Sequence, residues 1–205
     1  MSHARAWIVA AVVLAACEVV HAAEPADRDS VFTFYAARLA RERTWQHVLT
    51  RPGQHFMDAY LVAGAIAKPY AAFRNDTVRL EAEGQLAWHF GAQSHWEVNA
   101  VPFVARWRDF SWSERYATSL AFGLGYSYAT ELPRMEVSYK GRSGQSRVHW
   151  FAEIAVGPRN ARWSTALRLH HRSSGYGLLG DYGGMNAVGF GVRMRFGGYD
   201  GKVDL

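Results

Sequence analysis

His171 and Ser173, two positions apart, are the residues of this sequence whose types and spacing could do chemistry. Side chains two positions apart on a β-strand point to the same face, so the imidazole and the hydroxyl would lie within reach of each other. A histidine beside a serine is the minimal pair of general base and nucleophile. Asn186 could be the third group, which orients the imidazole. The pattern therefore predicts nucleophilic catalysis by a serine.

Two segments with alternating apolar residues, 163–172 and 186–196, are the predicted strands that would position these three residues. In the second segment an apolar face opposes a small or charged face: Phe190, Val192, Met194 and Phe196 against Gly189, Gly191, Arg193 and Arg195. Counted in steps of two residues, the apolar face of the second segment includes Asn186 at its start. The apolar face of the first segment includes His171 and Ser173 at its end. Antiparallel pairing would bring all three together at one end of the apolar face. Alternatively, they lie beyond a membrane edge, where polar side chains need no explanation.

The same period-two alternation recurs along the chain in segments of about ten residues, which is the pattern of a transmembrane β-barrel. We predict eight strands, at residues 31–40, 58–67, 78–90, 95–110, 116–129, 147–157, 163–172 and 186–196. The predicted fold is all-β: an eight-stranded antiparallel transmembrane β-barrel over residues 23–196, followed by a tail at 197–205. A change of phase near Pro102 predicts a bulge there.

Such a barrel turns its apolar residues to lipid and fills its interior with small and charged residues. Arginine–carboxylate pairs would close the lumen, and the candidates are Glu81, Glu83, Glu97 and Glu153 with Arg168, Arg193 and Arg195. His89, His149 and His170 also have interior parity, and we expect them to be members of this network rather than metal ligands. Tryptophans near strand ends would form interfacial girdles. The alternative is a soluble β-protein with these aromatic residues in its core.

An even strand number places both termini in the periplasm. The external loops would then be residues 41–57, 91–94, 130–146 and 173–185. The turn at 158–162, on the other side, is short. This asymmetry is typical of outer-membrane barrels.

The N-terminus has the features of a secretory signal peptide at residues 1–22: Arg5, an apolar run at 6–16, and small residues before a polar stretch. The run is too short to span a bilayer as a helix. We favour cleavage after position 22 or 23. Cleavage before Cys17, in a lipobox-like stretch, would instead leave a lipid-anchored protein, and a buried N-terminal helix is a further alternative.

Composition excludes several classes of protein. Cys17 is the only cysteine, so the mature chain has no disulfide scaffold and no cysteine-based metal site or nucleophile. The net charge is +5, but the arginines form no block, which argues against nucleic acid as a partner. No P-loop, Rossmann or zinc-site spacing is present, so we predict no cofactor and no metal.

The stretch 168–175, Arg-Leu-His-His-Arg-Ser-Ser-Gly, and the stretch 183–196 resemble the C-terminal region of the PagL-type lipid A 3-O-deacylases. The resemblance implies an eight-stranded outer-membrane barrel with a Ser–His–Glu triad that cleaves the acyl ester at position 3 of lipid A. It makes Ser173 the nucleophile and His171 the general base. The likeness follows strand order and loop sizes over most of the mature chain, and it is specific only over the last 30 or so residues.

Two positions depart from the family pattern. The family's glutamate falls on Asn186, which can fix the tautomer of His171 but cannot stabilise an imidazolium by charge. The asparagine of the family's H-x-S-N motif falls on Ser174. Asp181 is a second candidate for the missing carboxylate, and the backbone N–H groups of Ser174 and Gly175 are the candidates for the oxyanion hole.

The sequence therefore predicts an outer-membrane esterase that removes an ester-linked acyl chain from lipid A. Its partners would be lipopolysaccharide in the outer leaflet and the membrane lipid, and its oligomeric state is left open. The runner-up is a non-catalytic barrel of the same fold with a decayed site. A third hypothesis is a lipoprotein-anchored β-sandwich.

Overall fold

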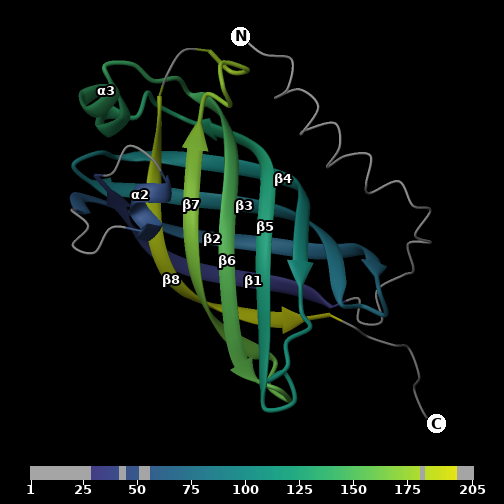
Figure 1. Ribbon diagram of the computed structural model, residues 1–205. Helices are drawn as coiled ribbons and strands as arrows, with labels where there is room; N and C mark the ends of the chain where they lie inside the picture. The colour runs from purple at the N-terminus through teal and green to yellow at the C-terminus, as the bar shows by residue number, and fades with distance from the viewer. Residues whose placement is uncertain (1–28, 42–44, 51–55, 181–182, 198–205) are drawn as a thin grey trace.

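The computed structural model describes residues 29–41, 45–50, 56–180 and 183–197. Eight antiparallel strands form a closed barrel in sequence order, with β1 pairing β8 (Figure 1). The strands are β1 Ser30–Ala40, β2 Phe56–Phe73, β3 Val78–Gly91, β4 His95–Trp107, β5 Tyr116–Ala129, β6 Ser146–Pro158, β7 Trp163–Ser173 and β8 Gly184–Phe196. The predicted fold is confirmed. No helix in these ranges is long and apolar enough to cross a membrane.

Two predicted strand bounds differ from the structure by more than two residues. β2 continues to Phe73, beyond the predicted end at 67, because Pro69 lies at a register shift where the missing N–H breaks no regular ladder. β4 ends at Trp107, before the predicted end at 110. The predicted bulge near Pro102 is present, since the β4–β5 register shifts between Ala100 and Phe103.

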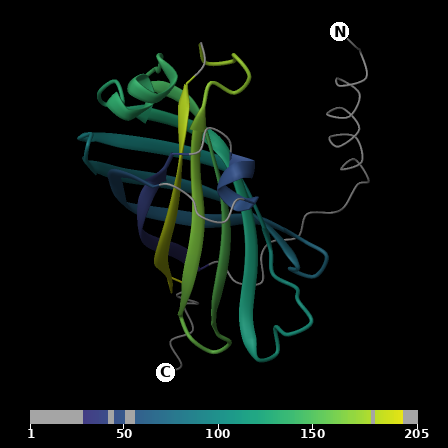
Figure 2. The ribbon, with the colours of Figure 1, turned by 60° about the vertical axis from the view of Figure 1, so that its left-hand side comes forward.

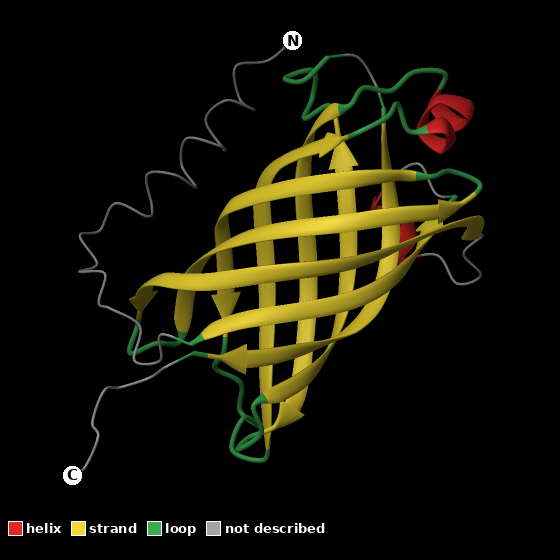
Figure 3. Ribbon diagram, turned by 180° about the vertical axis from the view of Figure 1, so that it is seen from behind, coloured by secondary structure: helices red, strands yellow, loops and turns green. Residues whose placement is uncertain are grey.

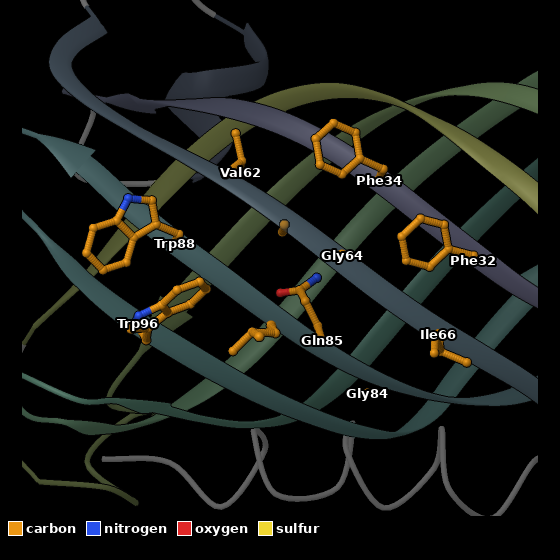
Figure 4. Close-up of a pocket in the computed structure, with 11 residues that line it drawn as sticks. Phe32, Phe34, Val62, Gly64, Ile66, Gly84, Gln85, Trp88 and Trp96 are labelled. Atoms are coloured by element: carbon orange, nitrogen blue, oxygen red, sulfur yellow. The ribbon is translucent and has the colours of Figure 1, made fainter.

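The outer face of the barrel is apolar, as predicted. Figure 4 shows a shallow hollow on this face, where Phe32, Phe34, Ile66 and Trp88 surround Gly64. These side chains alternate with buried ones that point into the lumen. In a transmembrane barrel this face contacts lipid acyl chains.

The lumen is closed by a network of buried ion pairs around Arg168 and Glu153. The Arg168 guanidinium lies 2.7 Å from Glu83 and 2.6 Å from Glu153. Glu153 is also 3.0 Å from Arg106 and 3.3 Å from Arg193. The predicted network is confirmed for these glutamates and for two of the three predicted arginines.

The predicted network differs from the structure at two arginines. Arg195, near the end of β8, donates to the carbonyl oxygen of Ala161 instead of entering the network around Glu153. Arg106, which was not among the candidates, takes part because the bulge at Pro102 reverses the facing of the rest of β4. It bonds Glu81 at 2.9 Å.

Two short helices, neither of them predicted, lie in the long loops at one end of the barrel, here named the outer end (Figures 1 and 3). Helix α2, Trp45–Thr50, lies in the β1–β2 loop, and α3, Arg134–Lys140, lies in the β5–β6 loop. Glu136 of α3 is buried and lies 3.3 Å from Arg172. A third long loop at this end, β7–β8, carries Asp181, which falls outside the described residues, as do the predicted signal peptide and residues 198–205.

Candidate active site

Strands β7 and β8 position the predicted trio at the outer end of the barrel. His171 pairs with Asn186 across the two strands, and Ser173 pairs with Gly184. The Nδ1 of His171 lies 2.7 Å from Oδ1 of Asn186. Because an amide oxygen can only accept, Nδ1 carries the proton and Nε2 keeps its lone pair. This is the tautomer that a general base needs.

His171 and Asn186 are buried although their parity directs them out of the barrel. Their exposed fractions are 8% and 1%. The indole of Trp150 stacks on His171 with ring centroids 4.4 Å apart, and Trp45 of α2 packs edge-on against Trp150. Val48 of α2 packs in the same outer-face cluster. Helix α2 therefore covers this part of the outer face, beside β7 and β8 (Figures 1 and 2).

Ser173 is the last residue of β7 and is partly exposed. Its Oγ accepts a hydrogen bond from the backbone N–H of Gly175 at 3.4 Å. Gly175 has φ +61°, and a Cβ at this position would also crowd Val148, so the turn after the serine requires glycine. Among the described residues no hydrogen bond joins Ser173 to His171.

The two backbone groups predicted for an oxyanion hole lie in the turn that follows β7. Gly175 N–H already points to the serine oxygen. The carbonyl oxygen of Ser174 accepts from Leu179 N at 2.9 Å, and this bond helps to close the turn. Gly175 N–H is therefore near the place where an oxyanion on a carbon bonded to Ser173 Oγ would form.

A hollow at the outer end lies between the β5–β6 and β7–β8 loops. Arg142, Arg147 and Leu179 are among the residues that line it. Arg147 donates to the carbonyl oxygen of Leu179 at 2.6 Å, so it joins the two loops.

Sequence reasoning missed two features around the site. The cover by α2 was not foreseen, although the apolar residues Trp45 and Val48 in a mostly polar loop were the available signal. The convergence of His89, His149 and His170 on Glu97 was also missed, since parity places each of them inside the barrel but does not give their heights along it.

No protein-family model matches the chain, and no curated protein matches it either. Among solved structures, the outer membrane enzyme PagL aligns with a TM-score of 0.54 and 9% identity, over 81% of this chain and 99% of that one. Neisserial surface protein A aligns with a TM-score of 0.47 and 14% identity, over 82% and 97% of the two chains. The N-terminal barrel domain of Pseudomonas aeruginosa OprF gives 0.40 and 16%, over 83% and 99%.

At 9% identity, the likeness to PagL establishes the fold alone. The fold is that of an outer-membrane β-barrel. The chemistry of the site has to be inferred from its own residues.

Proposed function

We propose that this chain is an outer-membrane serine esterase that removes an ester-linked acyl chain from lipid A, by 3-O-deacylation. Ser173 is the nucleophile, His171 its general base, and Asn186 the group that holds the imidazole. The observation that carries the proposal is the 2.7 Å bond from His171 Nδ1 to Asn186 Oδ1 on the outer face of the barrel. A histidine with its proton on Nδ1, two residues before a serine, has the tautomer that a general base requires.

The reaction follows from these positions. Ser173 Oγ attacks the ester carbonyl carbon while His171 Nε2 takes the hydroxyl proton. The oxyanion accepts a hydrogen bond from the N–H of Gly175. The imidazolium then protonates the leaving sugar oxygen, and water, activated by the same histidine, releases the fatty acid from Ser173.

The position on the outer face fits a substrate that is itself a membrane lipid. Lipid A reaches the site by lateral diffusion in the outer leaflet, so no deep pocket is required. Arg142 and Arg147 line the neighbouring hollow, where positive charge favours the phosphates of lipid A. The class of substrate rests on this location and on the sequence resemblance of the 168–175 stretch.

A second candidate is a barrel of the same fold without catalytic activity. It is favoured by two observations: Ser173 and His171 are not hydrogen-bonded to each other in the described structure, and Asn186 supplies no negative charge. Trp150 and α2 also cover His171. Contacts between base and nucleophile often tighten only when substrate binds, so the first candidate keeps its priority.

Mass spectrometry of lipid A from cells that carry the protein, and from cells that lack it, tests the proposal. Cells with the wild type are expected to show lipid A without its 3-linked chain. Ser173→Ala and His171→Ala should each abolish the change, and the double variant should be no worse than either one, because the two residues act as a unit. Asn186→Ala should retain activity at roughly a tenth of the wild-type rate, the effect of one hydrogen bond.

Ser138→Ala is the matched control, since Ser138 is an exposed serine of α3 in the same set of loops. It should leave activity unchanged. Asn186→Glu should raise activity, because a carboxylate stabilises the imidazolium that forms during the reaction. If both the wild type and Asn186→Glu form folded barrels but neither releases a 3-linked chain, the second candidate, a barrel without catalytic activity, is correct.

A further inference from the structure

A second cluster of titratable side chains lies in the lumen, directly behind the candidate active site. Four histidines converge on the carboxylate of Glu97: His89, His95, His149 and His170. All five side chains are buried. The donor atoms of Glu97, His149 and His170 lie within 4.8 Å of one another, and so do those of His89, His95 and Glu97. The cluster therefore contains two overlapping groups of three potential ligands.

In the group of His89, His95 and Glu97, hydrogen bonds account for His89. Gln93 Nε2 donates to Nδ1 of His89 at 3.1 Å, so His89 carries its proton on Nε2. That Nε2–H donates to Glu97 Oε2, also at 3.1 Å. The ring of His95 stacks on His89 with centroids 4.3 Å apart. Both nitrogens of His89 are thus in use within the protein, whereas Nε2 of His95 has no hydrogen-bond partner among the described residues.

In the group of Glu97, His149 and His170, three imidazole nitrogens have no such partner. Neither nitrogen of His149 has a hydrogen-bond partner among the described residues, although its side chain is 0% exposed. Nε2 of His170 lies 3.0 Å from Glu97 Oε1, but the pair does not have hydrogen-bond geometry. Buried polar groups without partners are rare and costly, so three such nitrogens in one group of potential ligands point to a ligand that the described residues do not supply.

We propose that Glu97, His149 and His170 bind a divalent transition-metal ion of the zinc class. Imidazole nitrogen and carboxylate oxygen are the donors that such ions take. Donors around a tetrahedral zinc ion are about 3.4 Å apart, and His170 Nε2 and Glu97 Oε1 are already at 3.0 Å. Asn99 donates to the same Oε1 at 2.8 Å, which leaves that oxygen a second lone pair for the ion.

The surroundings of this group suit a cation. The hydroxyl of Tyr35 lies 2.9 Å from Nδ1 of His170; when it accepts the Nδ1 proton, Nε2 presents its lone pair to the ion. Arg172 lies 3.5 Å from Oε2 of Glu97 and 3.3 Å from Glu136. Two carboxylates therefore face one guanidinium, and a bound dication adds to a locally negative site.

An ion held there would join β4, β6 and β7 through the lumen. His170 immediately precedes His171 in β7, so the same ion fixes the strand end that carries the candidate base. We assign the ion a stabilising role. It departs from the sequence-based expectation that these histidines form a network without a metal.

The site is tested by refolding the protein in detergent micelles with Zn²⁺ present and then removing unbound metal. Adding the ion before the barrel closes lets it reach the lumen. Elemental analysis should find one zinc per wild-type chain. The temperature of the heat-induced shift in gel mobility should be higher with zinc than with EDTA, because a ligand that binds only the folded state stabilises it. Neither readout depends on esterase activity, so this proposal and the proposed function can fail separately.

His149→Phe is the principal variant, since it replaces an unpartnered imidazole by an apolar ring of similar size. It should lose zinc and the zinc-dependent shift, while its transition in EDTA stays at the wild-type temperature or rises. Tyr35→Phe should weaken zinc binding by about 10–100-fold, the usual effect of losing an outer hydrogen bond to a metal ligand. His95→Phe is the matched control, because His95 is equally buried but belongs to the other group, and it should keep zinc.

The proposal is overturned if the wild type retains no zinc, if His149→Phe binds zinc as tightly as wild type, or if His95→Phe is the variant that loses it. If His149→Phe does not assemble, X-ray absorption of the zinc-loaded wild type decides the question. A four-coordinate shell with two imidazoles supports the site. A shell of oxygen atoms alone rejects it.

Discussion

His170 and His171 are neighbours in β7, and the strand places them in opposite environments. His170 points into the lumen, where it meets Tyr35 and the carboxylate of Glu97. His171 points outward, where its partner is the amide of Asn186. A step of one residue thus separates a histidine with a charged partner from one with a neutral partner.

The difference follows from what each face can tolerate. In the lumen, buried carboxylates are stabilised by several arginines, as Glu153 is by Arg106, Arg168 and Arg193. Asn186 is 1% exposed on the outer face, and burying a charge costs far more than burying an amide. An amide at position 186, where a Ser–His–Glu triad would have a carboxylate, therefore agrees with a trade of catalytic power for stability.

The largest effect is expected on the lumen side, from Arg168→Met. Glu83 loses its ion-pair partner and remains buried, so the free energy of unfolding should fall by about 3–5 kcal/mol. Denaturant titration of the refolded barrel measures it. Arg162→Ala is the control, because Arg162 is 64% exposed in its pair with Asp29 and should contribute less than about 1 kcal/mol. Equal losses in both variants would contradict the role assigned to the lumen network.

On the outer face, Leu167→Arg places a charge among lipid chains. Leu167 is 50% exposed and lies two positions before the buried end of β7. The change should cost about 2–4 kcal/mol near the bilayer midplane, measured by unfolding in lipid vesicles. Leu178→Arg, in the β7–β8 loop, is the control and should cost almost nothing. Equal tolerance at both positions would reverse the assignment of faces.

The fold was predictable because alternation along a strand is a local property of the sequence. The meeting of His171 and Asn186 followed from the same parity once the two strands were taken as neighbours. The position of Glu97 among four histidines was not predictable, since it depends on the stagger between β3, β4, β6 and β7, which no single strand encodes. Arg106 was missed for a related reason: its facing depends on the bulge at Pro102.

Asn186→Glu tests the proposed trade between activity and stability. A carboxylate at this buried position should lower the free energy of unfolding by about 1–3 kcal/mol, even as it raises esterase activity. Denaturant titration beside the lipid A assay measures both. Asn160→Glu, in the exposed β6–β7 turn, should change neither. A gain of stability in Asn186→Glu would mean that the outer face accepts charge as readily as the lumen does.

The smallest effect is expected from Val48→Ala, which loosens the cover over His171 and leaves the lumen cluster untouched. Val48 is 2% exposed and packs with Ala40 and Leu169. Losing its methyl groups should weaken the docking of α2 by about 1 kcal/mol, so that the α2 amides exchange hydrogen roughly fivefold faster. Gln46→Ala, on the exposed side of α2, is the matched control. If the α2 amides exchange hydrogen at the same rate in both variants, Val48 does not hold α2 on the barrel. The burial of His171 then rests on Trp150 alone.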